Sequence, residues 1–253
     1  ASMVLRLQIE DGTTQSLARL LPRRARITVD ARELTGALPR AFAATVESDH
    51  LVVADRTMTW DRRGYGSHSE TGSAAPALRW YLAEGATHSG MSLFYLVQNP
   101  GDQSAEIAID YLRPSPDAPV SKAYSVAPRS RLTIWVNQIA ELATADVSGD
   151  VRSTNGVPIV VERAMYMDRP GEPFAAGHAA SGVTELDTTW ILAEGATGDL
   201  FDEFILIANP GGQQADVTAT YAKPDGSTVL RTYRVAPRSR HTIHVDHEDP
   251  QLA

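Results

Sequence analysis

The sequence contains no cysteine. That absence excludes a disulfide framework, a thiolate nucleophile and a cysteine-based zinc site. Long hydrophobic runs are also missing, because no apolar stretch approaches the roughly 18 to 20 residues that a membrane-spanning helix needs. We therefore expect no membrane insertion. The lack of cysteine is compatible with the cytosol and with bacterial secretion.

Positive charge is in deficit, with 23 lysine and arginine residues against 31 aspartate and glutamate residues and a formal net charge of −8. The two signs are interspersed, which does not produce a surface that follows a phosphate backbone. We expect no nucleic-acid partner. Ala1 and Ser2, which precede Met3, are typical of a cloning remnant, so this end of the chain does not reveal the localisation.

The main feature that the sequence does contain is a repeat. The stretch W-Y-L-A-E-G-A-T, which starts at Trp80, recurs as W-I-L-A-E-G-A-T at Trp190, and later segments match with one residue deleted. The matched segments are 80–87 with 190–197, 99–101 with 209–211, and 126–131 with 235–240. A repeat of this length is a whole domain, because solenoid units have about 20 to 50 residues.

Fainter matches extend the repeat upstream. The segment 21–29 resembles 128–134, and 53–58 resembles 160–165. The chain therefore divides into an N-terminally incomplete unit, a complete unit and a C-terminally incomplete unit, with the boundaries 1–78, 79–187 and 188–253. Two explanations stay open: the chain is a piece of a longer array, or the partial units complete each other.

Apolar residues of the complete unit alternate with a period of two, which is typical of β-strands. Turn signals such as Asn155-Gly156 separate the alternating segments, and only 137–143, with an upstream counterpart at 31–34, predicts a short helix. The predicted strands are 79–84, 92–98, 104–112, 121–127, 131–137, 148–153 and 157–167. Seven short strands in this span predict an all-β protein of tandem immunoglobulin-like antiparallel β-sandwiches.

A repeated glutamate interrupts an otherwise apolar strand. Alternation places Glu84 on the same face as Trp80, and the copy places Glu194 in the equivalent position. The last strand of the complete unit carries Arg163 among apolar residues, and the upstream unit carries Arg56 in the matching place. An unpaired buried charge is very costly, so we predict structural glutamate–arginine ion pairs.

Two pairings of these charges are open. If a unit begins at Trp80, Glu84 pairs with Arg163, and this is the frame we favour. If the tryptophan strand instead completes the preceding unit, Arg56 pairs with Glu84 and Arg163 pairs with Glu194. A catalytic role for the glutamates is the alternative, but the Gly-Ala-Thr that follows supplies no obvious polar partner, and tandem copies of an active site are unusual. We predict no catalytic residue.

Two acidic residues beside these arginines have a different environment in this reading. Glu162 and Asp55 alternate to the opposite face of their strands, where we expect them to be solvated.

The C-terminal segment has residue types that bind metals, including His244, Asp246 and His247. On a strand, His241 and His244 point to opposite faces and do not converge. The segment is therefore interpreted as a polar strand and tail.

Asp199, Asp202 and Glu203 form an acidic cluster that could ligate calcium. The matching loop, 88–92, contains no acidic residue, which speaks against a general calcium role. We predict no metal site and no cofactor.

Trp135 is the candidate ligand-binding residue. In its strand Ile134 faces inward, so Trp135 faces outward, and the equivalent residue of the next unit is His244. An exposed tryptophan can stack on a sugar or on a neighbouring domain. Cover by a linker is the alternative.

The successive patterns W-x-L-A-E-G-A-T, F-x-L-x-x-N-P-G, V-A-P-R-S-R and V-E-R-A-M-Y resemble tandem repeats of uncharacterised bacterial surface and secreted proteins. The strand–Asn-Pro-Gly–strand portion is also similar to adhesion-related immunoglobulin-like modules. The resemblance implies an extracellular or cell-surface β-sandwich and carries over no catalytic residue.

These observations predict a non-enzymatic structural, adhesion or spacer module. Neighbouring repeat modules or other protein chains are the expected partners, with polysaccharide as a further candidate. The alternatives are a carbohydrate-binding module that uses Trp135 and a hydrolase with a site between modules.

Overall fold

The computed structural model describes residues 1–36, 41–60, 66–250 and 252. Almost all of its regular structure is antiparallel β-sheet, so the predicted all-β class is confirmed. Helical structure in these residues is limited to α1 (Arg32–Thr35) and three short 3-10 turns, η1 (Val136–Gln138), η2 (Ala140–Leu142) and η3 (Val245–His247). No helix in this part of the chain is long and apolar enough to span a membrane.

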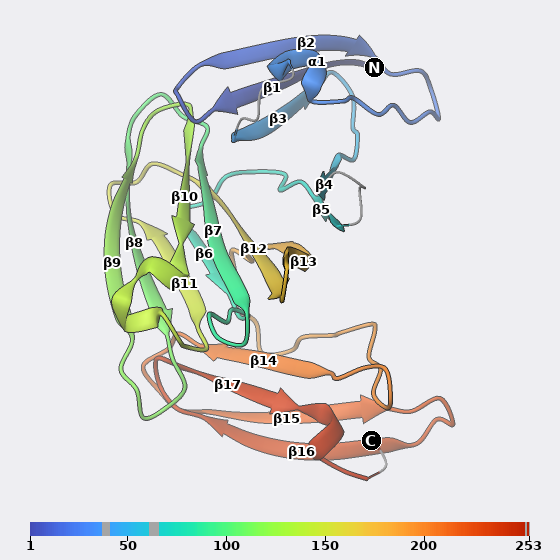
Figure 1. Ribbon diagram of the computed structural model, residues 1–253, viewed down its shortest axis with the longest axis vertical. Coiled ribbons are helices and arrows are strands. Elements are labelled where there is room, and N and C mark those ends of the chain that lie inside the picture. The colour runs from blue at the N-terminus through green and yellow to red at the C-terminus, as the bar shows by residue number, and fades with distance from the viewer. Residues whose placement is uncertain (37–40, 61–65, 251, 253) are drawn as a thin grey trace.

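The middle part of the chain forms two four-stranded sheets that face each other (Figure 1). One sheet has the order β10-β7-β12-β13 and the other the order β6-β11-β8-β9. Their strands are β6 (Arg79–Leu82), β7 (Met91–Asn99), β8 (Ala105–Leu112), β9 (Val120–Val126), β10 (Ser130–Trp135), β11 (Ser148–Ser153), β12 (Val160–Arg169) and β13 (Glu172–Ser181). Both sheets contribute to one hydrophobic core, which includes Trp80, Tyr95, Ile109 and Val161.

The strand order differs from that of a constant-type immunoglobulin domain. There the first strand lies beside the second and the seventh beside the sixth. Here the first strand, β6, pairs with β11, and the seventh, β12, pairs with β7. The first strand of the predicted unit thus lies in the sheet of the sixth strand, and the last lies in the sheet of the second. This is the reverse of the immunoglobulin arrangement.

The N-terminal part divides into two pieces. The strands β1 (Ser2–Ile9), β2 (Thr14–Leu20) and β3 (Phe42–Ser48) form one sheet in the order β2-β1-β3, and α1 packs against it. The hairpin of β4 (Asp55–Trp60) and β5 (Gly66–Thr71) lies instead against the middle unit, where Trp60 Nε1 donates a 2.7 Å hydrogen bond to the Phe174 carbonyl. The N-terminal residues therefore continue into the middle unit as packed structure.

The C-terminal part forms two two-stranded sheets. The strands β14 (Phe204–Asn209) and β17 (Ser239–His244) make one, and β15 (Ala215–Ala222) and β16 (Thr228–Val235) make the other. Side chains of both sheets share a small core around Val229 and Ile243. Figure 1 shows the three parts in chain order along the long axis, with the C-terminal sheets at the opposite end from β1–β3.

Strand predictions for the complete unit agree with the structure at all seven positions, and the predicted short helix is the pair of turns η1 and η2. Three segments differ. The stretch 172–181, which lies outside the seven predicted strands, forms β13. Conversely, the segments that begin at Arg26 and Trp190 form no strand, although they resemble strands of the complete unit.

Candidate functional site at the joints between units

The structure brings Glu84 and Arg163 together. The Arg163 guanidinium, whose side chain is 4 % exposed, donates a hydrogen bond to Glu84, and the imidazole of His178 lies 3.5 Å from the other carboxylate oxygen. The pair joins the end of β6 to β12, which lie in different sheets. This is the frame in which a unit begins at Trp80.

The environment of Glu84 keeps it ionised. Burial opposes the charge, but the hydrogen bond with His178 and the positive charge of Arg163 outweigh that effect and lower the pKa of Glu84 to about 2. A general acid or base works best when its pKa lies near the working pH. Glu84 is therefore poorly suited to proton transfer at neutral pH and well suited to a structural ion pair.

The other two predicted pairing residues lie elsewhere. Arg56 forms an ion pair of 2.7 Å with Glu162, which the sequence analysis assigned to solvent, because the β4–β5 hairpin covers that face of β12. Glu194 is exposed and forms no hydrogen bond or ion pair with any residue that the structure describes. In the middle unit β11 pairs with β6 and β12 brings the arginine. Because Arg163 pairs with Glu84, the alternative pairing of Arg163 with Glu194 is wrong. The described C-terminal residues include no counterpart of β11 or β12, so a pair between Glu194 and an arginine of its own unit stays a prediction.

A repeated arginine, which the sequence analysis did not assign to any role, connects consecutive units. Arg131, the last residue of V-A-P-R-S-R in the middle unit, donates from Nη1 to the Phe42 carbonyl at the start of β3, at 3.3 Å. Its Nη2 donates to Thr133 Oγ1 at 2.7 Å. Beside it, Gln98 Nε2 donates to Gln8 Oε1 at 2.8 Å. These contacts join the middle unit to the N-terminal sheet.

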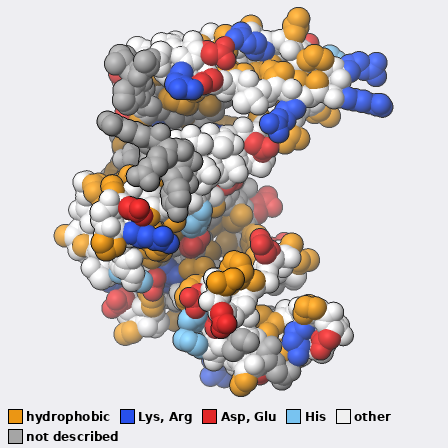
Figure 2. Space-filling model, turned by 45° about the vertical axis from the view of Figure 1, so that its right-hand side comes forward, with side chains coloured by type: hydrophobic (Ala, Val, Ile, Leu, Met, Phe, Trp, Pro, Cys, Tyr) orange, Lys and Arg blue, Asp and Glu red, His pale blue; other side chains and the backbone are white. Residues whose placement is uncertain are grey.

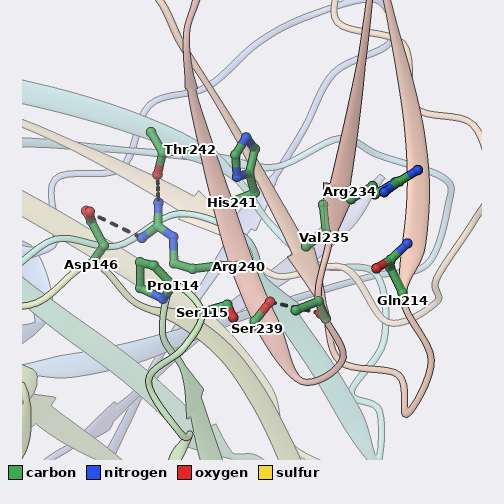
Figure 3. A pocket seen from close by; sticks show the side chains of 11 residues that line it. Pro114, Ser115, Asp146, Gln214, Arg234, Val235, Ser239, Arg240, His241 and Thr242 are labelled. Atoms are coloured by element: carbon green, nitrogen blue, oxygen red, sulfur yellow. Dashed lines mark hydrogen bonds and ion pairs between the residues drawn. The ribbon is translucent and has the colours of Figure 1, made fainter.

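Arg240 repeats this arrangement one unit further along the chain. It is 2 % exposed, and its Nη1 donates to the carbonyl of Gly85, which follows β6, at 2.7 Å and to that of Val147, directly before β11, at 3.1 Å. Its Nη2 donates to Thr242 Oγ1 at 2.7 Å, and Asp146 lies 3.7 Å from the guanidinium, as Figure 3 shows. At both joints one acceptor, Phe42 or Val147, thus lies where the preceding unit enters β11 or its counterpart β3.

The turn before each joint arginine has the same backbone. Arg129 and Arg238 both have positive φ angles, 51° and 50°, two residues before Arg131 and Arg240. Arg24 of the N-terminal unit has φ 53°, again two residues before an arginine, Arg26. Positive φ is uncommon outside glycine, so three occurrences at matching positions indicate a shared local structure.

Burial acts on both joint arginines. It lowers the pKa of Arg131 and of Arg240 because a guanidinium loses hydration in the interface. At Arg240 the negative charge of Asp146 opposes that effect. Carbonyl oxygens replace part of the lost hydration, since a guanidinium has five N–H donors and no acceptor.

A polar pocket of about 510 Å³ lies at the second joint (Figure 3). Arg240 and Asp146 line it together with Pro114, His241 and Gln214. A backbone bridge between Pro114 and Arg240, and an ion pair of 3.2 Å between Arg238 and Asp110, lie along the same contact. The pocket is a recess of the interface between the two units.

Trp135 is 41 % exposed, as its outward orientation predicted. One face of its ring stacks on Phe94, with centroids 5.6 Å apart, and its Nε1 donates to Asn137. Phe174, which is 37 % exposed, lies edge-on to Phe94. Trp135 therefore belongs to an aromatic surface that is open to a ligand on one side.

The two candidate metal clusters of the sequence partly merge. Asp202, His244 and Asp246 lie together, with their ligand atoms within 4.8 Å of one another. Asp199 and His241 are not part of this group, and His241 contacts the ring of Tyr233 instead.

Charge is distributed without a dominant patch on the face that Figure 2 shows, where acidic and basic side chains alternate over the surface.

Neither known protein families nor curated proteins provide a match to the chain. Several solved structures are weakly similar, and two of them serve as examples. A Thermotoga maritima protein, 1070, is 19 % identical over 44 % of this chain and 96 % of its own, with a TM-score of 0.40. The Anabaena sensory rhodopsin transducer is 24 % identical over 36 % of this chain and 86 % of its own, with a TM-score of 0.30. Likenesses of this size carry no argument about function.

Proposed function

We propose that the chain is a non-enzymatic structural segment in which consecutive β-sandwich units are held in fixed orientation by arginines at their joints. The observation that carries this proposal is the pair of equivalent joints at Arg131 and Arg240, each of which donates to main-chain carbonyls of the preceding unit. A spacer or presenting module of a bacterial surface or secreted protein needs such joints, because consecutive domains otherwise move relative to one another.

The immunoglobulin-like description and the extracellular location belong to the same proposal and rest on the sequence resemblance. The low pKa of Glu84 and its pairing with Arg163 support the non-enzymatic part, because they leave the repeated carboxylate no proton to exchange near neutral pH.

Further units of the same kind are the proposed partners. Arg26 stands where Arg131 and Arg240 stand, but it is exposed and forms no hydrogen bond or ion pair with another described residue. At the other end, Trp190 is 59 % exposed, whereas its equivalent Trp80 is 3 % exposed beneath its own unit. Arg26 and Trp190 are thus exposed at positions whose equivalents are in contact elsewhere in the chain. Arg131 and Arg240 contact the preceding unit, and Trp80 packs inside its own unit.

Small-angle X-ray scattering of the whole chain tests the joint. R240A should increase the radius of gyration and broaden the distribution of interatomic distances, because the carbonyls of Gly85 and Val147 lose their shared donor. R234A is the matched control, since Arg234 lies in the same unit and its side chain is 82 % exposed. Scattering from R240A that superimposes on the wild type would contradict the proposal.

Carbohydrate binding at Trp135 is the second candidate, favoured by the exposed aromatic surface that Trp135 forms with Phe94 and Phe174. A glycan array with the wild type, W135A and W190A separates the two functions. Binding that W135A abolishes and W190A retains would support it, because Trp190 is an exposed tryptophan outside that surface. An array without signal leaves the structural role as the proposed function.

A further inference from the structure

We propose that the C-terminal unit binds a divalent transition-metal ion between Asp202, His244 and Asp246. The site lies at the end of β17 and is separate from the joints, so it does not depend on the structural role proposed above. The three residues come from the loop before β14, the last position of β17 and the turn η3 that follows.

The distances between the ligand atoms fit a metal. His244 Nε2 lies 3.2 Å from Asp202 Oδ1 and 3.7 Å from Asp246 Oδ2. Ligands about 2.0–2.2 Å from a tetrahedral zinc ion are separated by roughly 3.3–3.5 Å. The group therefore needs only small side-chain movements to surround an ion.

The equivalent positions of the middle unit supply an internal comparison. There the residues are Ser92, Trp135, Asn137 and Gln138, and none of the four is a carboxylate or an imidazole. In the C-terminal unit the same four positions are occupied by Asp202, His244, Asp246 and His247. On one scaffold, these four positions carry residues that can bind a metal in one unit and none in the other, and three of them, Asp202, His244 and Asp246, bring their ligand atoms together.

The scaffold already orients the ligands. His244 stacks on Phe204 with ring centroids 4.4 Å apart, in the same manner as Trp135 on Phe94. Asp246 accepts the backbone N–H groups of Gly198 at 3.2 Å and Glu203 at 3.0 Å. Ligand positions that are fixed before binding reduce the entropy that an ion must offset.

Exposure and charge indicate how an ion would enter. The side chain of Asp202 is 74 % exposed, while those of His244 and Asp246 are 27 % and 13 % exposed. The site is therefore open on the side of Asp202, where water can complete the coordination. Two carboxylates and one neutral imidazole neutralise a divalent charge, and this donor set suits zinc and neighbouring first-row metals better than calcium, which prefers oxygen ligands alone.

Substitutions that restore the residues of the middle unit test the site with little risk to folding. D202S, H244W and D246N each remove one ligand, and D246N keeps one oxygen that can accept the Glu203 N–H, as Asn137 accepts the Leu93 N–H in the middle unit. D199S is the matched control, because Asp199 is an acid in the same loop, lies outside the group and also has serine as its counterpart, Ser89.

Two measurements on the chelator-treated full chain decide the question. Isothermal titration with Zn²⁺ should show one saturable site in the wild type and in D199S, and loss of a ligand should weaken binding at least about 10- to 100-fold, the range known for outer-shell partners. Co²⁺ should give the visible absorption of a four-coordinate ion in the same two proteins only. Absence of saturable Zn²⁺ binding, or binding that D202S and H244W leave unchanged, would overturn the proposal.

Discussion

At the scale of single residues, the Glu84–Arg163 pair is the clearest determinant of how the middle unit is closed. Its two members differ in their access to water, because the Glu84 side chain is 36 % exposed and the Arg163 side chain only 4 %. The cost of removing one member should depend on which charge remains, since an uncompensated charge is costly only where water cannot reach it.

The asymmetry predicts unequal losses of stability. E84Q leaves the buried guanidinium without a counter-charge and should lower the free energy of unfolding by about 3–5 kcal/mol. R163M leaves a carboxylate that water can reach and should cost less, about 1–3 kcal/mol. Urea denaturation measures both. E194Q, which changes the exposed equivalent glutamate, should stay within about 0.5 kcal/mol of the wild type, and equal losses for E84Q and R163M would contradict the prediction.

The low pKa of Glu84 also predicts how stability depends on pH. The folded-state pKa is about 2 and the ordinary value is 4.5, so the folded state favours the ionised form. The contribution of Glu84 is therefore complete above the ordinary value and decreases as the pH falls from 4.5 towards 2. The difference in free energy of unfolding between wild type and E84Q should shrink across that range. A constant difference from pH 6 down to 2 would show that the charge of Glu84 is not responsible.

At the scale of strands, close packing between the sheets depends on glycines where a large side chain crosses. A Cβ atom on Gly149 of β11 would lie 2.6 Å from the hydroxyl of Tyr95, which is fully buried in the core. A second close contact lies within one sheet, where Gly177 of β13 stands opposite Tyr166 of β12 and a Cβ atom would lie 2.5 Å from the tyrosine ring. Both positions therefore lack room for a larger residue unless a neighbour shifts.

G149A should therefore destabilise the middle unit by about 1–3 kcal/mol, because overpacking forces the tyrosine or the strand to shift. Thermal denaturation measures the effect. G212A is the control, since no atom lies within 4 Å of the position of its Cβ. A melting temperature for G149A equal to that of G212A would show that Tyr95 moves freely.

Whether a segment forms a strand also depends on a neighbouring strand that can pair with it, and the alternation pattern does not show that neighbour. The segment at Trp190 repeats the β6 sequence but is no strand, because β6 is held by β11 and by the hydrogen bond from Trp80 Nε1 to the Ile159 carbonyl. In the opposite direction, 172–181 became β13 because β12 presents a free edge along most of its length.

At the scale of the whole molecule, hydrogen bonds from Arg131 and Arg240 connect the three parts into one curved arrangement (Figure 1). Both arginines donate to carbonyl oxygens, at 3.3 Å from Arg131 to Phe42 and 2.7 Å from Arg240 to Gly85, and Arg240 is shielded from solvent. Salt screens exposed charges strongly, with a Debye length of about 10 Å at 0.1 M and 3 Å at 1 M, but affects buried contacts much less.

Raising the salt concentration should therefore leave the dimensions of the molecule unchanged. Scattering measured at about 0.1 M and about 1 M salt should give the same radius of gyration. An increase at high salt would indicate that ion pairs with one solvent-exposed member, such as Arg238–Asp110, rather than Arg240, hold the units together.

The sequence by itself determined the all-β class, the strand positions of the complete unit and the repeat. Alternation and turn residues act locally, and the two copies of the repeat can be compared residue by residue. The cost of burying a lone charge also predicted glutamate–arginine pairs and favoured Glu84 with Arg163, while the pairing of Glu84 with Arg56 stayed open. Only the tertiary structure decided where Glu194 and Arg56 lie, what the last arginine of V-A-P-R-S-R contacts, and that Asp202 meets His244. Each depends on segments from different units, or from distant parts of one unit, that approach through packing, and no local periodicity records such an approach.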